Sequence, residues 1–217
     1  MLKISGLSKR FKKRVVIDNV DLELNFGNIY GFIGPNGSGK SVFFKTICGF
    51  LKADSGTVAL NGQVIGKDID FLPDLGVLIE KPGFIENYTQ YDNLKYLAQI
   101  KNTINDEDIR AALKMVGLEL DNTEKVKNFS LGMRQRLAIA QAIMEKQKIL
   151  ILDEPFNGLD KQGVAQIKQL ILELKSSDRL ILLTSHISGD IEELSDYIFE
   201  FSAGKIIPAN LQDAGSV

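Results

Sequence analysis

Three residue types are rare or absent in the 217 residues of this chain: it has one cysteine, one histidine and no tryptophan. A single cysteine excludes an internal disulfide, which is typical of a reducing compartment. Cys48 lies in an apolar helical stretch, which favours a buried structural thiol over a nucleophile. No apolar run reaches the roughly 18 to 20 residues that span a bilayer, and the N-terminus lacks a signal-peptide pattern. We therefore expect a cytoplasmic chain that does not cross a membrane by itself.

An excess of charge of either sign is also missing. The 26 lysines and arginines nearly balance 28 acids, for a net charge of −2, so nothing global attracts nucleic acid or an anionic membrane. The local exception, "KRFKKR" at residues 9–14, is more typical of a solvated turn between strands than of a nucleic-acid patch. We expect no nucleic-acid partner, and a single domain with a substantial core.

The apolar pattern changes twice along the chain. Short runs separated by turns predict strands first, then apolar residues at helical spacing predict an insert with no convincing strand, and strands alternating with helices return near the end. Such alternation indicates a parallel sheet covered on both faces. The expected strands are "LKISGLSKRF", "VVIDNVDLEL", "NIYGFIG", "GTVALNG", "LGVLI", "ILIL", "LILLT" and "YIFEF". The expected helices are Tyr91–Ile100, Asp106–Val116, Leu131–Glu145, Lys161–Lys175 and Ser188–Ser195.

A glycine-rich loop, "GPNGSGKS" at Gly34–Ser41, follows a predicted strand and opens a predicted helix. It fits the phosphate-binding pattern GxxxxGK(S/T) in the context that the pattern requires. The glycines let backbone N–H groups turn toward phosphate oxygens, and the helix N-terminus adds its positive dipole end. Lys40 supplies a mobile cation, and the hydroxyl of Ser41 suits Mg²⁺. The alternative, a merely glycine-rich turn, is disfavoured by the flanking strand and helix.

Two adjacent acids, Asp153 and Glu154, end the apolar strand in "ILILDEP". Sites in parallel sheets lie at the carboxyl ends of the strands, which places these acids where a phosphate group would bind. Asp153 is suited to hold Mg²⁺, and Glu154 to orient and deprotonate an attacking water. The alternative reading, ordinary acids at a strand end, is disfavoured by their adjacency after four aliphatic residues.

Three further segments complete a family pattern. "FSLGMRQRL" at 129–137 resembles the signature loop LSGGQ and its helix, although Phe129, Leu131 and Met133 depart from the commonest form. "NGLD" at 157–160 resembles the D-loop, and "TSH" at 184–186 the switch histidine. With the phosphate loop and the paired acids, the chain from about Leu2 to Ile207 resembles the ATP-binding subunits of ABC transporters.

This resemblance implies a fold class: an α/β P-loop NTPase of ABC type, with a mixed sheet core, an antiparallel β subdomain and an inserted α-helical subdomain. It implies one ATP-binding domain in two lobes. The core lobe would comprise residues 1–80 and 147–207, the helical lobe about 81–146, and a short tail 208–217.

The resemblance also implies the site. Two such subunits pack head to tail, and each ATP on one chain's phosphate loop is covered by the other chain's signature loop. His186 would contact the γ-phosphate, Asp160 would link the two sites, and Phe11 would stack on adenine, usually the role of a tyrosine. The implied ATP-binding residues are Phe11, Gly34, Pro35, Asn36, Gly37, Ser38, Gly39, Lys40, Ser41 and Val42, and the implied signature residues are Ser130, Leu131, Gly132 and Met133.

Glu80 departs from the family. The strand "LGVLI" leads to a position that is usually glutamine and contacts Mg²⁺ and the attacking water; here it is an acid. The segment "IEKPGF" and the signature "SLGMRQRL" resemble one branch in particular, the ABC exporters of bacitracin and lantibiotics. We expect Glu80 to join Ser41 and Asp153 as a metal ligand and to act beside Glu154 and His186 in catalysis. The alternative is a surface acid tolerated at a loose position.

The leading hypothesis is a Mg²⁺-dependent ATPase that works as a dimer and drives a separate membrane permease from the cytoplasmic side. One alternative is an ABC-type ATPase without a permease that remodels a soluble protein assembly. Another is a nucleotide-binding module that hydrolyses poorly, which the presence of Glu154, His186 and Asp160 disfavours.

Overall fold

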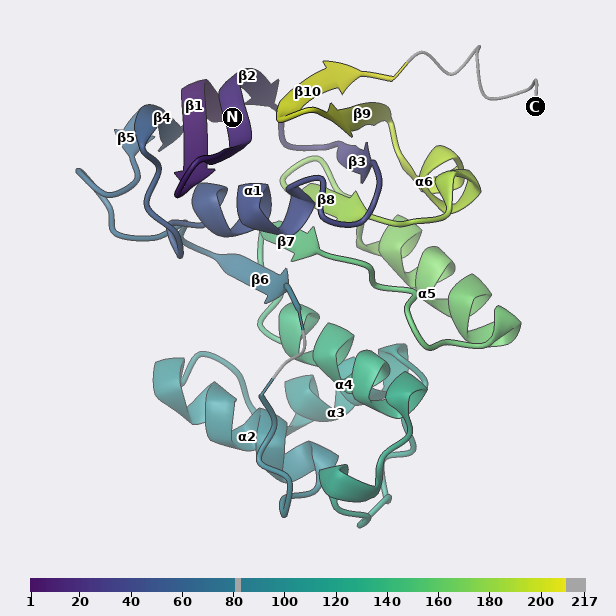
Figure 1. Ribbon diagram of the computed structural model, residues 1–217. Helices are drawn as coiled ribbons and strands as arrows, with labels where there is room; N and C mark the ends of the chain where they lie inside the picture. Colours follow the sequence, from purple (N-terminus) through teal and green to yellow (C-terminus); the bar gives the residue numbers. More distant parts are fainter. Residues whose placement is uncertain (81–82, 210–217) are drawn as a thin grey trace. The chain divides into compact units, whose positions relative to one another are not determined.

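The computed structural model describes residues 1–80 and 83–209 (Figure 1). Its internal contacts divide the chain into two compact units: Met1–Pro73 with Leu182–Val217, and Asp74–Ile181. Within the described residues, no helix combines the length and the apolar character needed to span a bilayer.

The first unit contains an antiparallel sheet in the order β2-β1-β4-β5. Phe11 pairs with Arg14 across a two-residue turn, so the basic run at residues 9–14 spans the end of β1, the turn between two strands that the sequence predicted, and the start of β2. Asn61 and Gly62 both have positive φ, the conformation that an Asn-Gly hairpin turn of type I′ requires. The strands are β1 (Leu2–Phe11), β2 (Arg14–Leu24), β4 (Ser55–Leu60) and β5 (Gln63–Val64).

A mixed sheet also runs through the first unit, in the order β10-β9-β3-β8. β9 pairs in parallel with β3 and antiparallel with β10. Phe32, which is fully buried on β3, contacts Phe43, Phe44 and Phe201, and this aromatic cluster fixes the helix α1 (Lys40–Ile47) against the sheet. The strands are β3 (Ile29–Ile33), β8 (Leu180–Thr184), β9 (Tyr197–Ser202) and β10 (Lys205–Pro208). A short helix, α6 (Ser188–Leu194), packs on β3.

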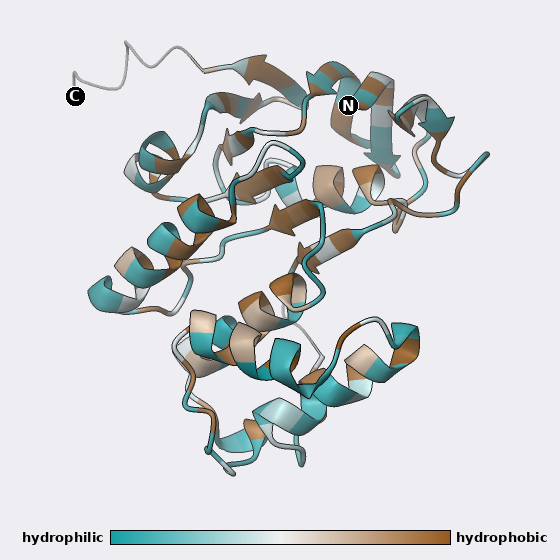
Figure 2. Ribbon diagram, turned by 180° about the vertical axis from the view of Figure 1, so that it is seen from behind, coloured by the Kyte–Doolittle hydropathy of each residue, from teal (hydrophilic) through white to brown (hydrophobic). Residues whose placement is uncertain are grey.

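The second unit contains β6 (Leu75–Leu78) and β7 (Ile149–Leu152), which pair in parallel. The start of β8 lies next to β7, where the Leu180 N–H donates to the Lys148 carbonyl at 2.8 Å. Every residue of β7 and β8 is buried, which explains their continuous apolar runs. In Figure 2 the short core strands are accordingly hydrophobic, whereas the helices carry both colours.

The helical part of the second unit consists of α2 (Gln90–Lys101), α3 (Asp106–Met115), the 3-10 turn η1 (Val126–Asn128) and α4 (Leu131–Ile143), followed after β7 by α5 (Lys161–Leu174). Thr89 with Asp92 forms a capping box at the start of α2, and Asn105 with Asp108 forms one at α3. Between residues 83 and 146, the only extended pairing in the described chain is the isolated bridge Thr89–Lys125, so the insert is helical, as predicted.

Two short strands were not predicted. β5 has two residues, and β10 is a mostly exposed edge strand that ends in Pro208, so neither has an apolar alternation to reveal it. β10 returns along β9 through Ala203 and Gly204, both with positive φ. Residues 210–217 of the predicted tail lie outside the described residues, and the lobe boundaries predicted from the sequence stay a prediction.

Candidate nucleotide site

The loop Gly34–Ser41 connects β3 to α1, the context that the sequence predicted. Two of its glycines have backbone angles that other residues rarely adopt: φ is 145° at Gly34 and 116° at Gly39. A Cβ at Gly39 would also lie 3.0 Å from the carbonyl oxygen of Val16. The sharp path of the loop therefore depends on glycine at these positions.

Lys40 lies folded inside this loop. Its side chain is buried, and Nζ donates to the carbonyls of Gly34 at 2.7 Å and Pro35 at 3.3 Å. From the outside, Arg14 Nη2 donates to the carbonyl of Gly37 at 2.8 Å, so the β1–β2 hairpin supports the loop. Within the described residues, the hydrogen bonds of this ammonium group thus go to neutral backbone carbonyls, which leave its positive charge available to an anion.

The loop fits a phosphate group on two independent observations. The hydroxyl of Ser38 is buried and has no hydrogen-bond partner within the described chain. The first turn of α1 carries no acidic side chain that would compete with an anion at the helix N-terminus. An unsatisfied hydroxyl, an ammonium group and a helix N-terminus are the groups that bind phosphate oxygens.

A hollow of about 380 Å³ opens beside the loop within the first unit. His186, which is exposed, lies on its wall together with Ser185, whose hydroxyl accepts from the Ile187 N–H at 3.0 Å. The lining residues are Ile33, Gly34, Pro35, Asn36, Ser185, His186, Ser188 and Glu200. The structure therefore brings the only histidine of the chain next to the phosphate loop.

Phe11 lies in the same unit, at the end of β1. Its side chain is 46% exposed, and Lys9 Nζ lies 5.5 Å from the centre of its ring. Because Arg14, its partner across the hairpin, reaches Gly37, this hairpin presents an accessible aromatic ring near the loop.

In the second unit, the acids Glu80, Asp153 and Glu154 gather at one edge of the sheet. The Asp153 N–H donates to the Leu78 carbonyl at 2.7 Å, and Leu78 is in register with Leu152. Asp153 and Glu154 follow β7 directly, and Glu80 lies two residues after the end of β6, so the acids lie just past the carboxyl ends of these strands. Glu80 and Glu154 both have left-handed backbones, with φ of 61° and 54°.

A metal would need more than these side chains. No cluster of three or more histidine, cysteine, aspartate or glutamate side chains suited to a metal occurs within residues 1–80 and 83–209. Mg²⁺ usually takes one or two carboxylates together with phosphate oxygens, so such a site is consistent with a metal that arrives with a nucleotide.

The predicted signature loop forms the start of α4. Ser130 is the N-cap, and its hydroxyl accepts from the Met133 N–H at 3.2 Å. Leu131 is 57% exposed, whereas a Cβ at Gly132 would lie 2.9 Å from the carbonyl oxygen of Gly158. The signature loop therefore packs against the predicted D-loop of the same chain.

Asp160 caps α5, and its carboxylate accepts from the Gly163 N–H at 2.8 Å. This cap explains why an acid ends the D-loop, whatever its role toward a second chain.

Two side chains just after the signature loop were missed at the sequence level. Arg134 forms a bidentate pair with Glu86, both nitrogen–oxygen distances being 2.9 Å, and this hydrogen-bonded pairing lowers the pKa of the Glu86 carboxyl. Gln135 Nε2 donates to the carbonyl of Glu154 at 2.9 Å. Partners so distant in the chain leave no signal in a single sequence.

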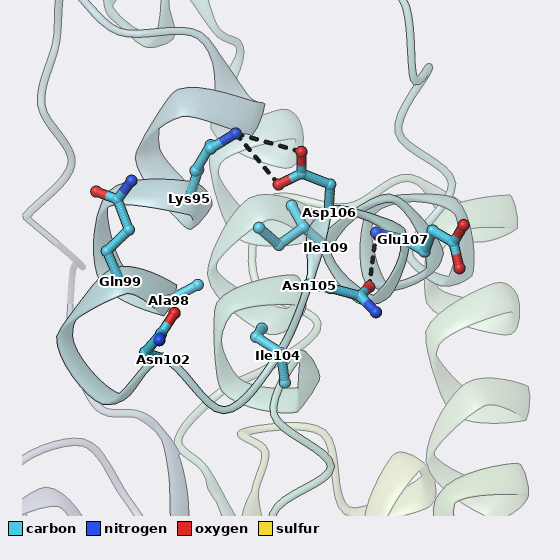
Figure 3. A pocket seen from close by; sticks show the side chains of 9 residues that line it. All are labelled: Lys95, Ala98, Gln99, Asn102, Ile104, Asn105, Asp106, Glu107 and Ile109. Atoms are coloured by element: carbon cyan, nitrogen blue, oxygen red, sulfur yellow. Dashed lines mark hydrogen bonds and ion pairs between the residues drawn. The ribbon is translucent and has the colours of Figure 1, made fainter.

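A second hollow, of about 590 Å³, lies between α2 and α3 (Figure 3). Lys95 points to Asp106 and pairs with it at 3.2 Å, and the Asn105 side chain caps the Glu107 N–H at 2.9 Å. Because its lysine is already neutralised by a carboxylate, this hollow does not offer a phosphate the cation that the glycine loop offers.

Comparison with known families decides the identity of the fold. The ABC transporter family profile matches residues 17–157, well over half of the chain. The chain belongs to the ABC transporter family, as an ATP-binding subunit. The family resemblance drawn from its motifs is thereby confirmed.

Among relatives of this ABC subunit, an uncharacterized ABC transporter ATP-binding protein of Bacillus subtilis (strain 168), YybJ, is 40% identical over 95% of this chain and 94% of its own. The lantibiotic transport ATP-binding protein SrtF of Streptococcus pyogenes is 38% identical, covering 95% and 89%. The bacitracin transport ATP-binding protein BcrA of Enterococcus faecalis is 34% identical, covering 95% and 68%. These names match the branch that the segment around Glu80 suggested.

Solved structures agree on the fold. A structure described as the dimer of MJ0796, a bacterial ABC transporter cassette, superposes with a TM-score of 0.87 at 23% identity, covering 97% of this chain and 99% of that one. An ATP-binding subunit of an ABC transporter superposes with a TM-score of 0.85 at 26% identity, covering 98% and 91%. The predicted fold class is confirmed.

Proposed function

We propose that this ABC subunit binds and hydrolyses ATP and, by closing on a second subunit, drives a separate membrane permease. The observation that carries the proposal is the glycine loop with Lys40 folded inside it and His186 on the wall of the same hollow. Family membership supports it, because the matched residues 17–157 include the glycine loop, the signature loop and the paired acids Asp153 and Glu154.

In this proposal, ATP lies with its phosphates in the loop 34–41 and against Val42, and its adenine stacks on Phe11. Lys40 moves from backbone carbonyls to phosphate oxygens, which replaces weak acceptors by charged ones. The hydroxyl of Ser38 gains the partner that it lacks in the described chain.

Mg²⁺ would be held by Ser41, Asp153 and Glu80 and would neutralise charge on the phosphate oxygens. Glu154 takes a proton from water, whose oxygen forms a bond to the γ-phosphorus while the bond to the β–γ bridging oxygen breaks. ADP and phosphate leave. His186 donates a hydrogen bond to the γ-phosphate, where negative charge must be stabilised.

The second ATP-binding subunit, an identical chain or a close relative, completes the site. Ser130 and Gly132 stand at the start of α4, where N–H groups and the helix dipole favour an anion, and Leu131 and Met133 flank them. They would cover the γ-phosphate of the partner's ATP, with Asp160 beside them. Dimerisation then depends on nucleotide, because ATP forms part of the interface.

Glu80 gives the proposed site an unusual charge. Two unit charges about 4 Å apart at an effective dielectric near 20 interact by about 4 kcal/mol. Glu80 should attract Mg²⁺ and repel the γ-phosphate to similar extents. We propose that Glu80 ties hydrolysis to metal occupancy and, through the segment that follows it, to contact with the permease. Lys81 in that segment lies outside the described residues.

The proposal for the transported cargo rests on similarity to named relatives. Relatives named as lantibiotic and bacitracin transport proteins support export of a peptide antibiotic of that type, with the subunit docked on the cytoplasmic face of its permease.

A pull-down of the tagged chain from detergent-solubilised membranes of its host, followed by mass spectrometry, tests the transporter role. An untagged strain is the control for background. Recovery of a multi-spanning membrane protein is expected, and its identity narrows the cargo. Recovery of soluble partners alone would replace the transporter role by an ATPase that remodels a soluble assembly, and the antibiotic-export proposal would fail with it.

A further inference from the structure

The backbone of Glu154 is held by a side chain from the signature helix. Gln135 Nε2 donates to the Glu154 carbonyl at 2.9 Å, and the Asn157 N–H donates to the same oxygen at 3.2 Å. On the other side, the Asp153 N–H donates to the Leu78 carbonyl at 2.7 Å. The backbone around the residue that we propose as the base is therefore held at the Glu154 carbonyl and at the N–H of the preceding residue, Asp153.

This fixing matters because Glu154 has a strained backbone. Its φ of 54° lies in the left-handed region, which residues other than glycine adopt at a cost and keep only where surrounding contacts enforce it. Rotation of the Glu154 carbonyl changes ψ of the same residue. Losing the Gln135 donor would leave this carbonyl with the Asn157 N–H alone and would loosen the backbone that positions the carboxylate at the strand end.

Gln135 lies on α4 two residues after Met133, the last residue of the signature loop. Leu131 and Gln135 are four residues apart and so share a face of α4. Leu131 packs on Gly158, where an added Cβ would lie 2.5 Å from Leu131 Cγ. One face of α4 thus covers the turn from Glu154 to Gly158, with Gln135 at one end and Leu131 at the other.

We propose that Gln135 is a positioning residue for Glu154. Through it, binding of the partner's ATP to the signature loop would change the position of Glu154 in the same chain. The inference rests on the proposed function, in which Ser130 and Gly132 cover the partner's ATP. A movement of α4 when the dimer closes reaches Glu154 through the Gln135 side chain. The ATP bound to the partner subunit thereby controls the position of Glu154, which acts on the ATP bound to its own chain.

Turnover kinetics test the positioning role. Gln135→Glu keeps the shape of the side chain but replaces the donor by an acceptor, so kcat should fall about tenfold, as for loss of one hydrogen bond. KM for ATP should stay unchanged, because Gln135 touches no nucleotide in the proposal, and Gln135→Lys, which retains a donor, should restore part of kcat. Gln141→Glu is the matched control on α4, since the Gln141 side chain makes no hydrogen bond to the described chain.

Hydrogen exchange tests the link without requiring turnover. In a Glu154→Gln background, Mg²⁺ and ATP should slow exchange at the Asn157 and Gly158 amides, and Gln135→Glu should abolish that protection. Without nucleotide, Gln135→Glu alone should speed exchange at Asn157. An unchanged kcat together with unchanged exchange would overturn the inference, as would equal losses from Gln141→Glu. Absence of ATP turnover in the unaltered protein would instead refute the proposed function, while the nucleotide-free exchange would still decide whether Gln135 holds the turn.

Discussion

At the scale of single residues, Glu80 is the departure with the clearest chemical consequence. It follows β6 at the same edge as Asp153 and Glu154, because Leu78 and Leu152 are in register. Its backbone is left-handed, so the chain turns sharply at this acid. In the proposed site the Glu80 carboxylate lies near both Mg²⁺ and the γ-phosphate. We therefore expect its effect in the dependence of catalysis on Mg²⁺.

Replacing Glu80 by glutamine should leave ATP affinity intact and weaken the dependence of turnover on Mg²⁺, because a neutral amide binds the ion less strongly. Turnover measured across a Mg²⁺ titration at saturating ATP reports this change. Glu107→Gln, the same substitution on α3, is the control. Superimposable titrations for Glu80→Gln and the unaltered chain would remove Glu80 from the metal site.

Cys48 illustrates a residue whose role is packing. It is fully buried, and burial raises the pKa of its thiol to about 12. We expect no reaction with a thiol reagent at pH 8.5 until urea unfolds the chain, since the thiolate is the reactive form. Rapid stoichiometric labelling of the native protein would contradict this.

The sign of the stability effect follows from the same shift. The pKa of the folded state lies above the ordinary value of 9.0, so the fold favours the neutral thiol. Its contribution to the free energy of unfolding is present below about pH 9 and is lost as the pH rises toward 12. Urea unfolding of Cys48→Ala and of the unaltered chain should therefore converge over that range.

At the scale of helices and strands, the sequence revealed what is local. The continuous apolar runs of β7 and β8, the helical spacing of α2, α3 and α4, and the glycine loop are each encoded in adjacent residues. β5 and β10 were missed because two- and four-residue edge strands need no apolar alternation.

The residues of the candidate site also fall into those that the sequence predicts and those that it does not. The motif residues could be predicted because each motif occupies one short segment. The bonds from Gln135 to Glu154 and from Arg134 to Glu86 could not, because they depend on how distant segments pack. Ordinary polar residues after a signature loop look like solvated helix positions until a structure shows their partners.

The contact between α4 and β6 depends on a residue without a side chain. A Cβ at Gly76 would lie 1.9 Å from the carbonyl oxygen of Ala142 and 2.7 Å from Leu150 Cδ2. Gly76→Ala should lower the free energy of unfolding by about 1 to 3 kcal/mol or more, since the helix backbone must move away. Urea denaturation measures the loss.

Gly189→Ala is the control for that substitution, because a Cβ at Gly189 meets no heavy atom within 4 Å and its position in α6 favours alanine. It should leave stability unchanged or slightly raised. Equal stability of the two variants would show that α4 does not pack on β6 as described.

At the scale of the whole molecule, the proposed function requires a second subunit. The signature loop of one chain is proposed to complete the ATP site of another. In that proposal, ATP forms part of the interface and supplies binding energy between the subunits. The oligomeric state should respond to nucleotide and to the loop that binds it.

The most direct test of this central claim is light scattering of the Glu154→Gln protein with and without ATP and Mg²⁺. Glutamine at this position should slow hydrolysis while leaving ATP binding intact, so we expect a monomer without nucleotide and a dimer with it. Adding Lys40→Ala should abolish nucleotide binding and return the protein to a monomer. A monomer at saturating ATP, or a dimer that forms equally well without ATP, would contradict ATP-dependent dimerisation.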